Sequence, residues 1–100
     1  MYQFDAALWL YQGADPWHFL TLPATISDEI RKRVGDGPRP FGSVRVNATI
    51  GDTGWSTSLF PDAVGQTYLL PVKKSVRMAE HLSEGDRVSV ALELRSMSEE

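Results

Sequence analysis

Three basic residues within one short stretch are the strongest chemical signal in the sequence. Lys73 and Arg77 lie four positions apart and Lys74 and Arg77 lie three apart, so on a helix all three side chains share one patch. Basic residues at a helix start oppose the helix dipole, which makes a purely structural role less favourable there. Together with free backbone N–H groups they predict a site for a phosphate or carboxylate. In the alternative interpretation they only cover the surface and pair with acidic residues, namely Glu80, Glu84 or Asp86.

Large aromatic side chains near the N-terminus form a second candidate site. Trp9 and Tyr11 alternate along residues 3–12 on the face opposite the aliphatic one, and Trp17 follows after a short turn. A ligand pocket walled by these three aromatic rings would explain the pattern. A strand buried on both faces, with the rings in the core or at its rim, would explain it as well.

The residues that usually perform catalysis do not form a complete set. His18 and His81 fall on different expected elements, and neither has a His or Glu at the spacing of a metal site. The run from Trp55 to Ser58 contains hydroxyls but lacks the second glycine of a nucleophile elbow. The chain has no cysteine, which excludes disulfides and thiolate chemistry. We therefore expect no catalytic residues, no metal and no cofactor.

Alternation of apolar and polar residues predicts a mainly β fold that would position these side chains. Strand-like patterns occur in six stretches, at residues 3–12, 17–22, 41–50, 55–60, 67–70 and 88–94. The second stretch is expected to pair with the first across the intervening turn. The two cleanest alternating strands predict an interior that contains Val44, Val46, Val88, Val90 and Leu92.

Two further stretches carry the helical period. An apolar stripe at four-residue spacing predicts a helix over residues 23–34, with Thr25 or Ser27 as its cap and a turn at 35–38 as its end. A second stripe predicts a helix over residues 72–82. The second helix would carry the three basic residues near its start.

The two halves of the chain repeat one arrangement. Each half has a strand, a Leu-Pro pair, an amphipathic helix, a turn and a long alternating strand, with Leu22-Pro23 corresponding to Leu70-Pro71. Two such units can pair about a pseudo-two-fold axis and close a barrel, which removes exposed sheet edges. We predict a mainly β fold, a small closed or double-split β-barrel of about six strands with two short helices. It would form a single domain over residues 1–95, followed by a frayed acidic tail at 96–100.

Several spaced motifs also resemble a known family. They are Leu8-Trp9, Trp17-His18-Phe19, Leu22-Pro23, residues 41–46, 55–61 and 68–74, and Gly85-Asp86. Together they resemble the bacterial domain-of-unknown-function family 1905 over nearly the whole chain. The resemblance implies a small β-barrel, in some members joined to a YdeI/OmpD-associated domain, and it implies no particular activity. Leu70-Pro71 and residues 84–88 are also similar to the swapped-hairpin barrel half of AbrB-like regulators, in which such a half dimerises and binds DNA.

Charge and composition limit the expected partners and location. The chain of 100 residues has a net charge of −3, which argues against nucleic-acid binding by bulk electrostatics, so any anion site must be local. No stretch approaches the roughly 18 apolar residues of a membrane span, and residues 1–13 have no Lys or Arg and do not resemble a secretory signal. We expect a cytoplasmic protein that does not bind membranes.

These observations favour a non-catalytic binding module for a small anionic or nucleic-acid-like ligand, acting as a monomer or weak homodimer. Nucleic acid itself is the less favoured ligand because of the negative net charge. The alternative is a structural or protein-interaction domain, which a hydrophobic patch for self-association would favour. A small-molecule enzyme comes third, since the sequence offers no catalytic set.

Overall fold

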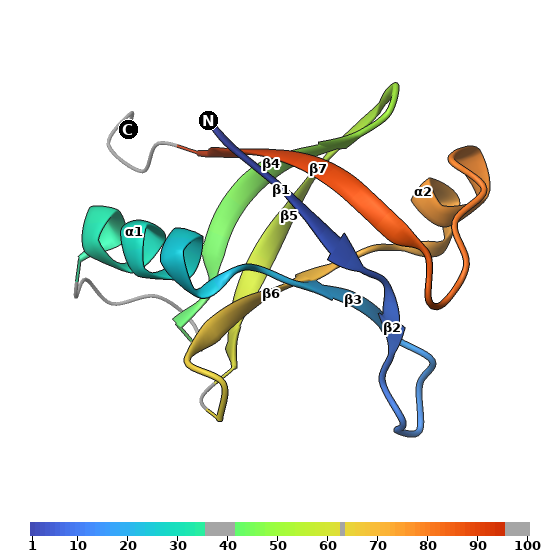
Figure 1. The fold of residues 1–100 in the computed structure, drawn as a ribbon, viewed down its shortest axis with the longest axis horizontal. Coiled ribbons are helices and arrows are strands. Elements are labelled where there is room, and N and C mark those ends of the chain that lie inside the picture. The colour runs from blue at the N-terminus through green and yellow to red at the C-terminus, as the bar shows by residue number, and fades with distance from the viewer. Residues whose placement is uncertain (36–41, 63, 96–100) are drawn as a thin grey trace.

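The elements of the chain follow the order that the sequence patterns predict. The computed structural model describes residues 1–35, 42–62 and 64–95. The elements are β1 (Tyr2–Ala7), β2 (Trp9–Leu10), β3 (His18–Thr21), α1 (Ala24–Val34), β4 (Val44–Ile50), β5 (Thr53–Asp62), β6 (Thr67–Pro71), α2 (Lys74–Ala79) and β7 (Arg87–Leu94) (Figure 1). Three predicted features lie outside the described residues: the turn at 36–38, the first residue of the 41–50 strand and the tail at 96–100.

The strands form an almost closed antiparallel barrel. Their order in the sheet is β1-β7-β4-β5-β6-β3-β2, and the two end strands, β1 and β2, are separated in the chain only by Leu8 (Figure 1). The buried Leu8 donates its N–H to Asp86 O at 2.9 Å and accepts the N–H of Gly85 at 2.7 Å. The chain therefore bends at Leu8 without losing backbone hydrogen bonds. β1 and β2 therefore act as one bent strand that joins the two ends of the sheet. Counted in this way, the seven strands of the structure agree with the predicted barrel of about six.

The barrel interior contains the residues that the alternating patterns predicted. Buried and exposed residues alternate along the whole of β4 and along most of β7. The interior residues of these strands include Val44, Val46, Val88, Val90 and Leu92, each at most 3% exposed. Burying a side chain of this kind stabilises the fold by about 1.5–3 kcal/mol. The predicted assignment of inner and outer faces is confirmed for these two strands.

A pseudo-two-fold axis relates the two strand-helix units. β3 and β6 pair antiparallel with Leu20 opposite Leu70, and α1 and α2 lie at opposite ends of the barrel (Figure 1). Two equivalent backbone hydrogen bonds of 2.9 Å flank this pair, from Leu22 N–H to Tyr68 O and from Val72 N–H to His18 O. In the structure Leu20 is therefore equivalent to Leu70. The sequence comparison matched Leu22-Pro23 with Leu70-Pro71, and this predicted correspondence is wrong by two residues.

Helix α1 has nearly its predicted length but not its predicted cap. Pro23 precedes the helix, and no side chain caps its first turn. Thr25 is exposed, whereas Ser27 is fully buried within the helix and its Oγ accepts the N–H of Tyr68 at 3.1 Å. The Ser27 hydroxyl therefore joins α1 to β6.

Helix α2 has six residues, fewer than the predicted 72–82. Its C-cap residue Glu80 accepts a hydrogen bond of 2.6 Å from Thr53 Oγ1, which holds α2 against the β4–β5 hairpin. His81 follows with φ +55°, a left-handed conformation that ends a helix. Within the described ranges, neither helix is long and apolar enough to cross a membrane.

Candidate functional site

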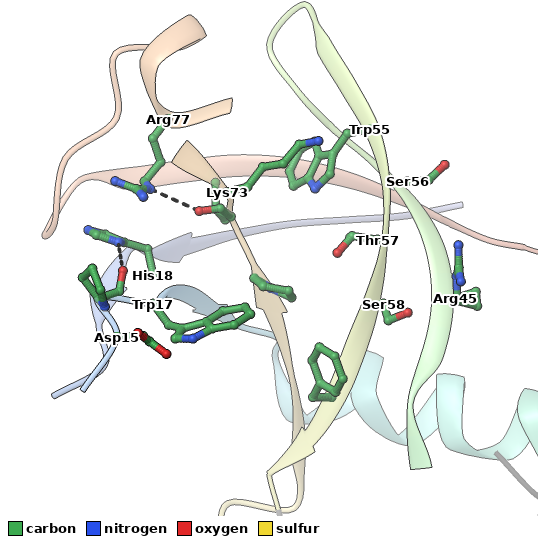
Figure 2. Close-up of a pocket in the computed structure, with 14 residues that line it drawn as sticks. Asp15, Trp17, His18, Arg45, Trp55, Ser56, Thr57, Ser58, Lys73 and Arg77 are labelled. Atoms are coloured by element: carbon green, nitrogen blue, oxygen red, sulfur yellow. Dashed lines mark hydrogen bonds between the residues drawn. The ribbon is translucent and has the colours of Figure 1, made fainter. Parts of the chain in front are cut away.

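The wall of the barrel has a gap between β5 and β6. β5 pairs with β4 from Thr53 to Leu59, but it pairs with β6 only from Phe60 to Asp62. Towards the start of β5 the two strands diverge, as Figure 2 shows. A pocket of about 490 Å³ lies there, walled by β5, the loop before β3 and the segment that joins β6 to α2. We call it the basic pocket.

The basic pocket exposes one edge of β5. Trp55 and Thr57 point across the gap, whereas Ser56 and Ser58 point to the other side of the strand, where Arg45 lies (Figure 2). In a strand, the backbone N–H and C=O groups of successive residues point to opposite edges. Between Thr53 and Leu59, every second residue of β5 therefore directs its N–H and C=O away from β4 and towards the pocket. An unpaired strand edge offers hydrogen-bond donors and acceptors to a molecule that enters.

Positive charge exceeds negative charge around the basic pocket. Lys73 at the N-cap of α2 and Arg77 within α2 both line it, and Arg45 of β4 lines it on the far side of β5. His18 adds an imidazole from the start of β3. Asp15 is the one carboxylate among the described residues that line the pocket. Because opposite charges attract more strongly in a concave site than in bulk water, this composition favours an anion.

The two cations beside α2 differ in how firmly they are held. Arg77 Nε donates to Val72 O at 3.1 Å, which fixes the start of the guanidinium group (Figure 2). Lys73 is exposed, and its ammonium has no hydrogen-bond or ion-pair partner among the described residues. The one ion pair across the described part of the chain joins Arg31 to Asp28 at 2.7 Å. The cations of the pocket are therefore not neutralised by a described carboxylate.

The structure separates Lys74 from the other two residues of the predicted anion site. Lys73 and Arg77 line the basic pocket, but Lys74, although exposed, is not among its lining residues. Helix α2 has only six residues, and its early N–H groups on Val76 and Arg77 already donate to Lys73 O. We therefore give the helix start no role, and the predicted anion site is reduced to Lys73 and Arg77.

A second hollow of about 490 Å³ adjoins the basic pocket and contains the predicted aromatic residues. We call it the aromatic groove. Its lining residues are Trp9, Tyr11, Trp17, Phe19, Phe60, Asp62 and Leu69. Trp17 and Phe60 line both hollows, so the aromatic groove and the basic pocket meet at these two side chains.

The rings of the aromatic groove are arranged around Phe19. Trp17 stacks on Phe19 at 5.9 Å between ring centroids with 8° between the planes, Trp9 is tilted at 5.3 Å, and Tyr11 meets it edge-on at 6.4 Å. Trp9 Nε1 donates to Thr21 Oγ1 at 2.9 Å, and the Tyr11 N–H donates to Trp17 O at 2.8 Å. Hydrogen bonds as well as packing thus hold the cluster in place.

Two of these rings lie at the surface, whereas Trp9 and Phe19 are partly buried. Tyr11 is 51% exposed and Trp17 is 49% exposed. The alternative interpretation of their pattern, a strand buried on both faces, does not apply to this part of the chain.

Ser56 and His18, which line the basic pocket, make separate contacts. Ser56 Oγ donates to Asn47 Oδ1 across two strands at 2.7 Å, and His18 Nδ1 lies 3.2 Å from Pro16 O. Among the described side chains neither histidine is hydrogen-bonded to a hydroxyl. No three His, Asp or Glu side chains of the described ranges gather as the ligands of a metal ion would.

Sequence reasoning missed Arg45, His18 and Phe60 as pocket residues. Arg45 is an outward residue in an alternating strand, and such a pattern does not indicate what lies opposite it. The approach of β5 to α2 arises only when the barrel closes. The signal that pointed towards the site was the cluster of basic residues beside α2, two of which line the pocket.

Comparison with known proteins identifies a family and adds no activity. A search of curated proteins found no match to the sequence. The model of one family, described as a domain of unknown function (DUF1905), matches residues 4–92. This span runs from β1 into β7 and includes both hollows, in agreement with the resemblance of the spaced motifs. The chain therefore belongs to the DUF1905 family.

Proposed function

We propose that the protein is a non-catalytic module that binds a small anionic ligand in the basic pocket. The observation that carries the proposal is the charge around one concave site, where Lys73, Arg77 and Arg45 face Asp15 as the one carboxylate among the described lining residues. The pocket volume of about 490 Å³ falls within the range common for small-molecule sites.

The groups around the pocket suit a phosphate or carboxylate. Arg77 uses Nε to bind Val72 O, and this leaves the two terminal nitrogens of the guanidinium to donate in a fixed geometry. Lys73 supplies a flexible ammonium that can approach the same anion. Neutral donors come from the free backbone edge of β5 and from the hydroxyl of Thr57. Charge-assisted hydrogen bonds of this kind are the strong ones.

The net charge of the chain favours a small ligand over a polyanion. At −3 the molecule as a whole repels a long nucleic acid, whose binding depends on many phosphate contacts. A ligand with one anionic group needs only the local excess of cations at the pocket. A single compact site of this kind is what the described surface offers around β5 and α2.

A protein-interaction domain is the second candidate. It is favoured by the exposed rings of Tyr11 and Trp17, because aromatic residues are enriched in the cores of protein interfaces. In that case the aromatic groove would be covered by a partner, and the basic pocket would have no small ligand of its own.

Titration of the protein with inorganic phosphate and with acetate at low salt tests the proposed function. Backbone amide shifts in an NMR spectrum should move for residues around the pocket, including Thr57 and Val72, and should yield a Kd. Lys73→Ala should weaken binding at least about tenfold, because a hydrogen bond to a charged group contributes roughly 1.5–3 kcal/mol.

Lys74→Ala is the matched control, because it removes the same charge from the adjacent residue outside the pocket. We expect this variant to bind within about twofold of the parent, since a surface charge contributes little. Absence of binding by the parent, or an equal loss in both variants, would contradict the proposed site.

A further inference from the structure

We infer that the ligand of the basic pocket carries a planar aromatic ring, which stacks on Trp17 and extends into the aromatic groove. The inference rests on the proposed function, because the anionic group of the same ligand would lie against Lys73 and Arg77. The observation behind it is a juxtaposition: the basic pocket and the aromatic groove share Trp17 and Phe60. One molecule can therefore occupy both hollows.

Trp17 presents a flat and firmly held surface. The ring of Phe19 lies parallel to its indole, with 5.9 Å between the centroids and 8° between the planes, and the Trp17 side chain remains 49% exposed. Its backbone is anchored on both sides, because its N–H donates to Asp15 O at 2.9 Å and its carbonyl accepts the N–H of Tyr11 at 2.8 Å. A ring that stacks on Trp17 loses little free energy in ordering the protein, since the platform already exists.

The register of the strands extends this platform across the outer face of the sheet. Trp9 on β2 lies opposite Phe19 on β3, and Phe19 lies opposite Pro71 on β6. Leu69, two residues before Pro71, lies opposite Phe60 on β5. Residues directly opposite each other in an antiparallel pair share a face, as do residues two apart on one strand. Four neighbouring strands thus present a row of apolar groups that ends beside the gap at β5.

Polar groups beyond the two ends of β6 indicate which kind of ring fits. Lys73 and Arg77 follow the end of β6 and line the basic pocket, whereas Asp62 pairs with Thr67 at the start of β6 and lines the aromatic groove. A carboxylate accepts hydrogen bonds and has none to donate when ionised. The arrangement suits a nitrogen-containing aromatic ring that bears N–H groups and is joined to a phosphate or carboxylate. An aliphatic acid could neither stack on the indole of Trp17 nor donate a hydrogen bond to Asp62.

Two pairs of probes separate the contribution of the ring from that of the anion. Adenosine monophosphate is compared with ribose 5-phosphate, and indole-3-acetate with acetate, each by calorimetric titration of the full chain at low salt. In the parent, at least one ring-bearing probe should bind about tenfold more tightly than its ring-free counterpart, as expected for one base stacked on an aromatic side chain. The pair that shows the difference identifies the anionic group as phosphate or carboxylate.

Two variants of Trp17 then locate the ring. Trp17→Ala should abolish the difference, so that in this variant the ring-bearing probe and its ring-free counterpart bind with similar affinity. Trp17→Phe keeps an aromatic face and should retain most of the difference. Since Trp17 is half exposed, both variants should fold, which far-ultraviolet circular dichroism verifies.

The outcomes distinguish this inference from the proposed function. If ring-bearing and ring-free probes bind equally and both depend on Lys73, the ring is refuted while the anion site stands. If no probe binds the parent, both proposals fail. A ring-dependent gain that survives Trp17→Ala would place the ring elsewhere and overturn the inference. Dimerisation of the parent that Trp17→Ala abolishes would show that a second copy covers the groove, which also overturns it.

Discussion

Ser27 illustrates how one small side chain can fix the position of a whole helix. It is fully buried in α1, and its hydroxyl oxygen accepts the backbone N–H of Tyr68 on β6 at 3.1 Å. Sequence reasoning gave Ser27 as one of two candidate helix caps, with Thr25 as the other, because serine and threonine are common at that position. The pattern could not show that β6 would lie close enough to use the hydroxyl, since Ser27 and Tyr68 are 41 residues apart in the sequence.

Ser27→Ala should lower the free energy of unfolding by about 1–3 kcal/mol, because the N–H of Tyr68 is left buried without an acceptor. The better helix propensity of alanine works in the opposite direction by only a few tenths of a kcal/mol. Urea unfolding followed by circular dichroism measures the change. Thr25→Ala, at an exposed position of the same helix, is the control and should stay within about 0.5 kcal/mol of the parent. Equal stabilities of the two variants would refute the role of Ser27.

Lys73 and Lys74 show why adjacent residues of the same type diverge in function. Lys73 is the N-cap of α2 and has an extended backbone with φ −71° and ψ 162°, whereas Lys74 is the first helical residue. The spacing argument assumed that both lie on a regular helix, so it placed all three basic side chains on one patch. The sequence identified the basic cluster, but the backbone at the helix boundary determines which lysine lines the pocket.

At the scale of elements, α2 depends on its neighbours. An isolated helix of six residues is not stable in water, so tertiary contacts must hold it. Thr53 binds Glu80 at one end and Arg77 binds Val72 O near the other. Gly51, with φ +59°, fits beneath this contact because a Cβ at its position would collide with the Glu80 carboxylate. The β4–β5 hairpin therefore positions the helix that carries Arg77.

Thr53→Val should loosen α2, because it keeps the shape of the side chain and removes the hydrogen bond to Glu80. Loss of a hydrogen bond that contributes about 1 kcal/mol should speed amide hydrogen exchange in α2 about fivefold. Exchange measured by NMR at residues 76–80 gives the result. The control is Thr49→Val, an exposed threonine on β4, which should leave exchange in α2 unchanged. Identical exchange in the two variants would show that the Thr53 contact does not hold the helix.

The strands were predicted more accurately than the second helix, for a physical reason. β4 and β7 bury one face each, and this imposes a period of two on the sequence. In the second helix, Val72 contributed to the apolar stripe, yet it precedes α2 and pairs its N–H with His18 O. Over a few residues, the sequence pattern of a buried extended segment cannot be distinguished from that of a buried helix.

At the scale of the molecule, the candidate site is where barrel closure is incomplete. β5 has ten residues and β6 has five, so the shorter strand cannot pair with the longer one along its whole length. The sequence predicted stretches of more similar length, at 55–60 and 67–70, and therefore gave no indication of a gap. Closure of the barrel was predictable from the repeat. The place where it fails depends on strand lengths and register, which a single sequence specifies poorly.

The barrel has one continuous interior, and a substitution at its centre tests the whole architecture. Leu92 is fully buried on β7, opposite Tyr2 on β1 and Ala48 on β4. Leu92→Ala leaves a cavity that all three strands line, so it should cost about 2–5 kcal/mol out of a total stability of about 5–15 kcal/mol. Met78→Ala, at a side chain that is 65% exposed, should change stability by less than about 0.5 kcal/mol. Chemical unfolding measures both variants. If Leu92→Ala unfolds together with the parent, the assignment of this face to the interior is wrong, because truncating a closely packed side chain cannot leave the stability of a single core unchanged.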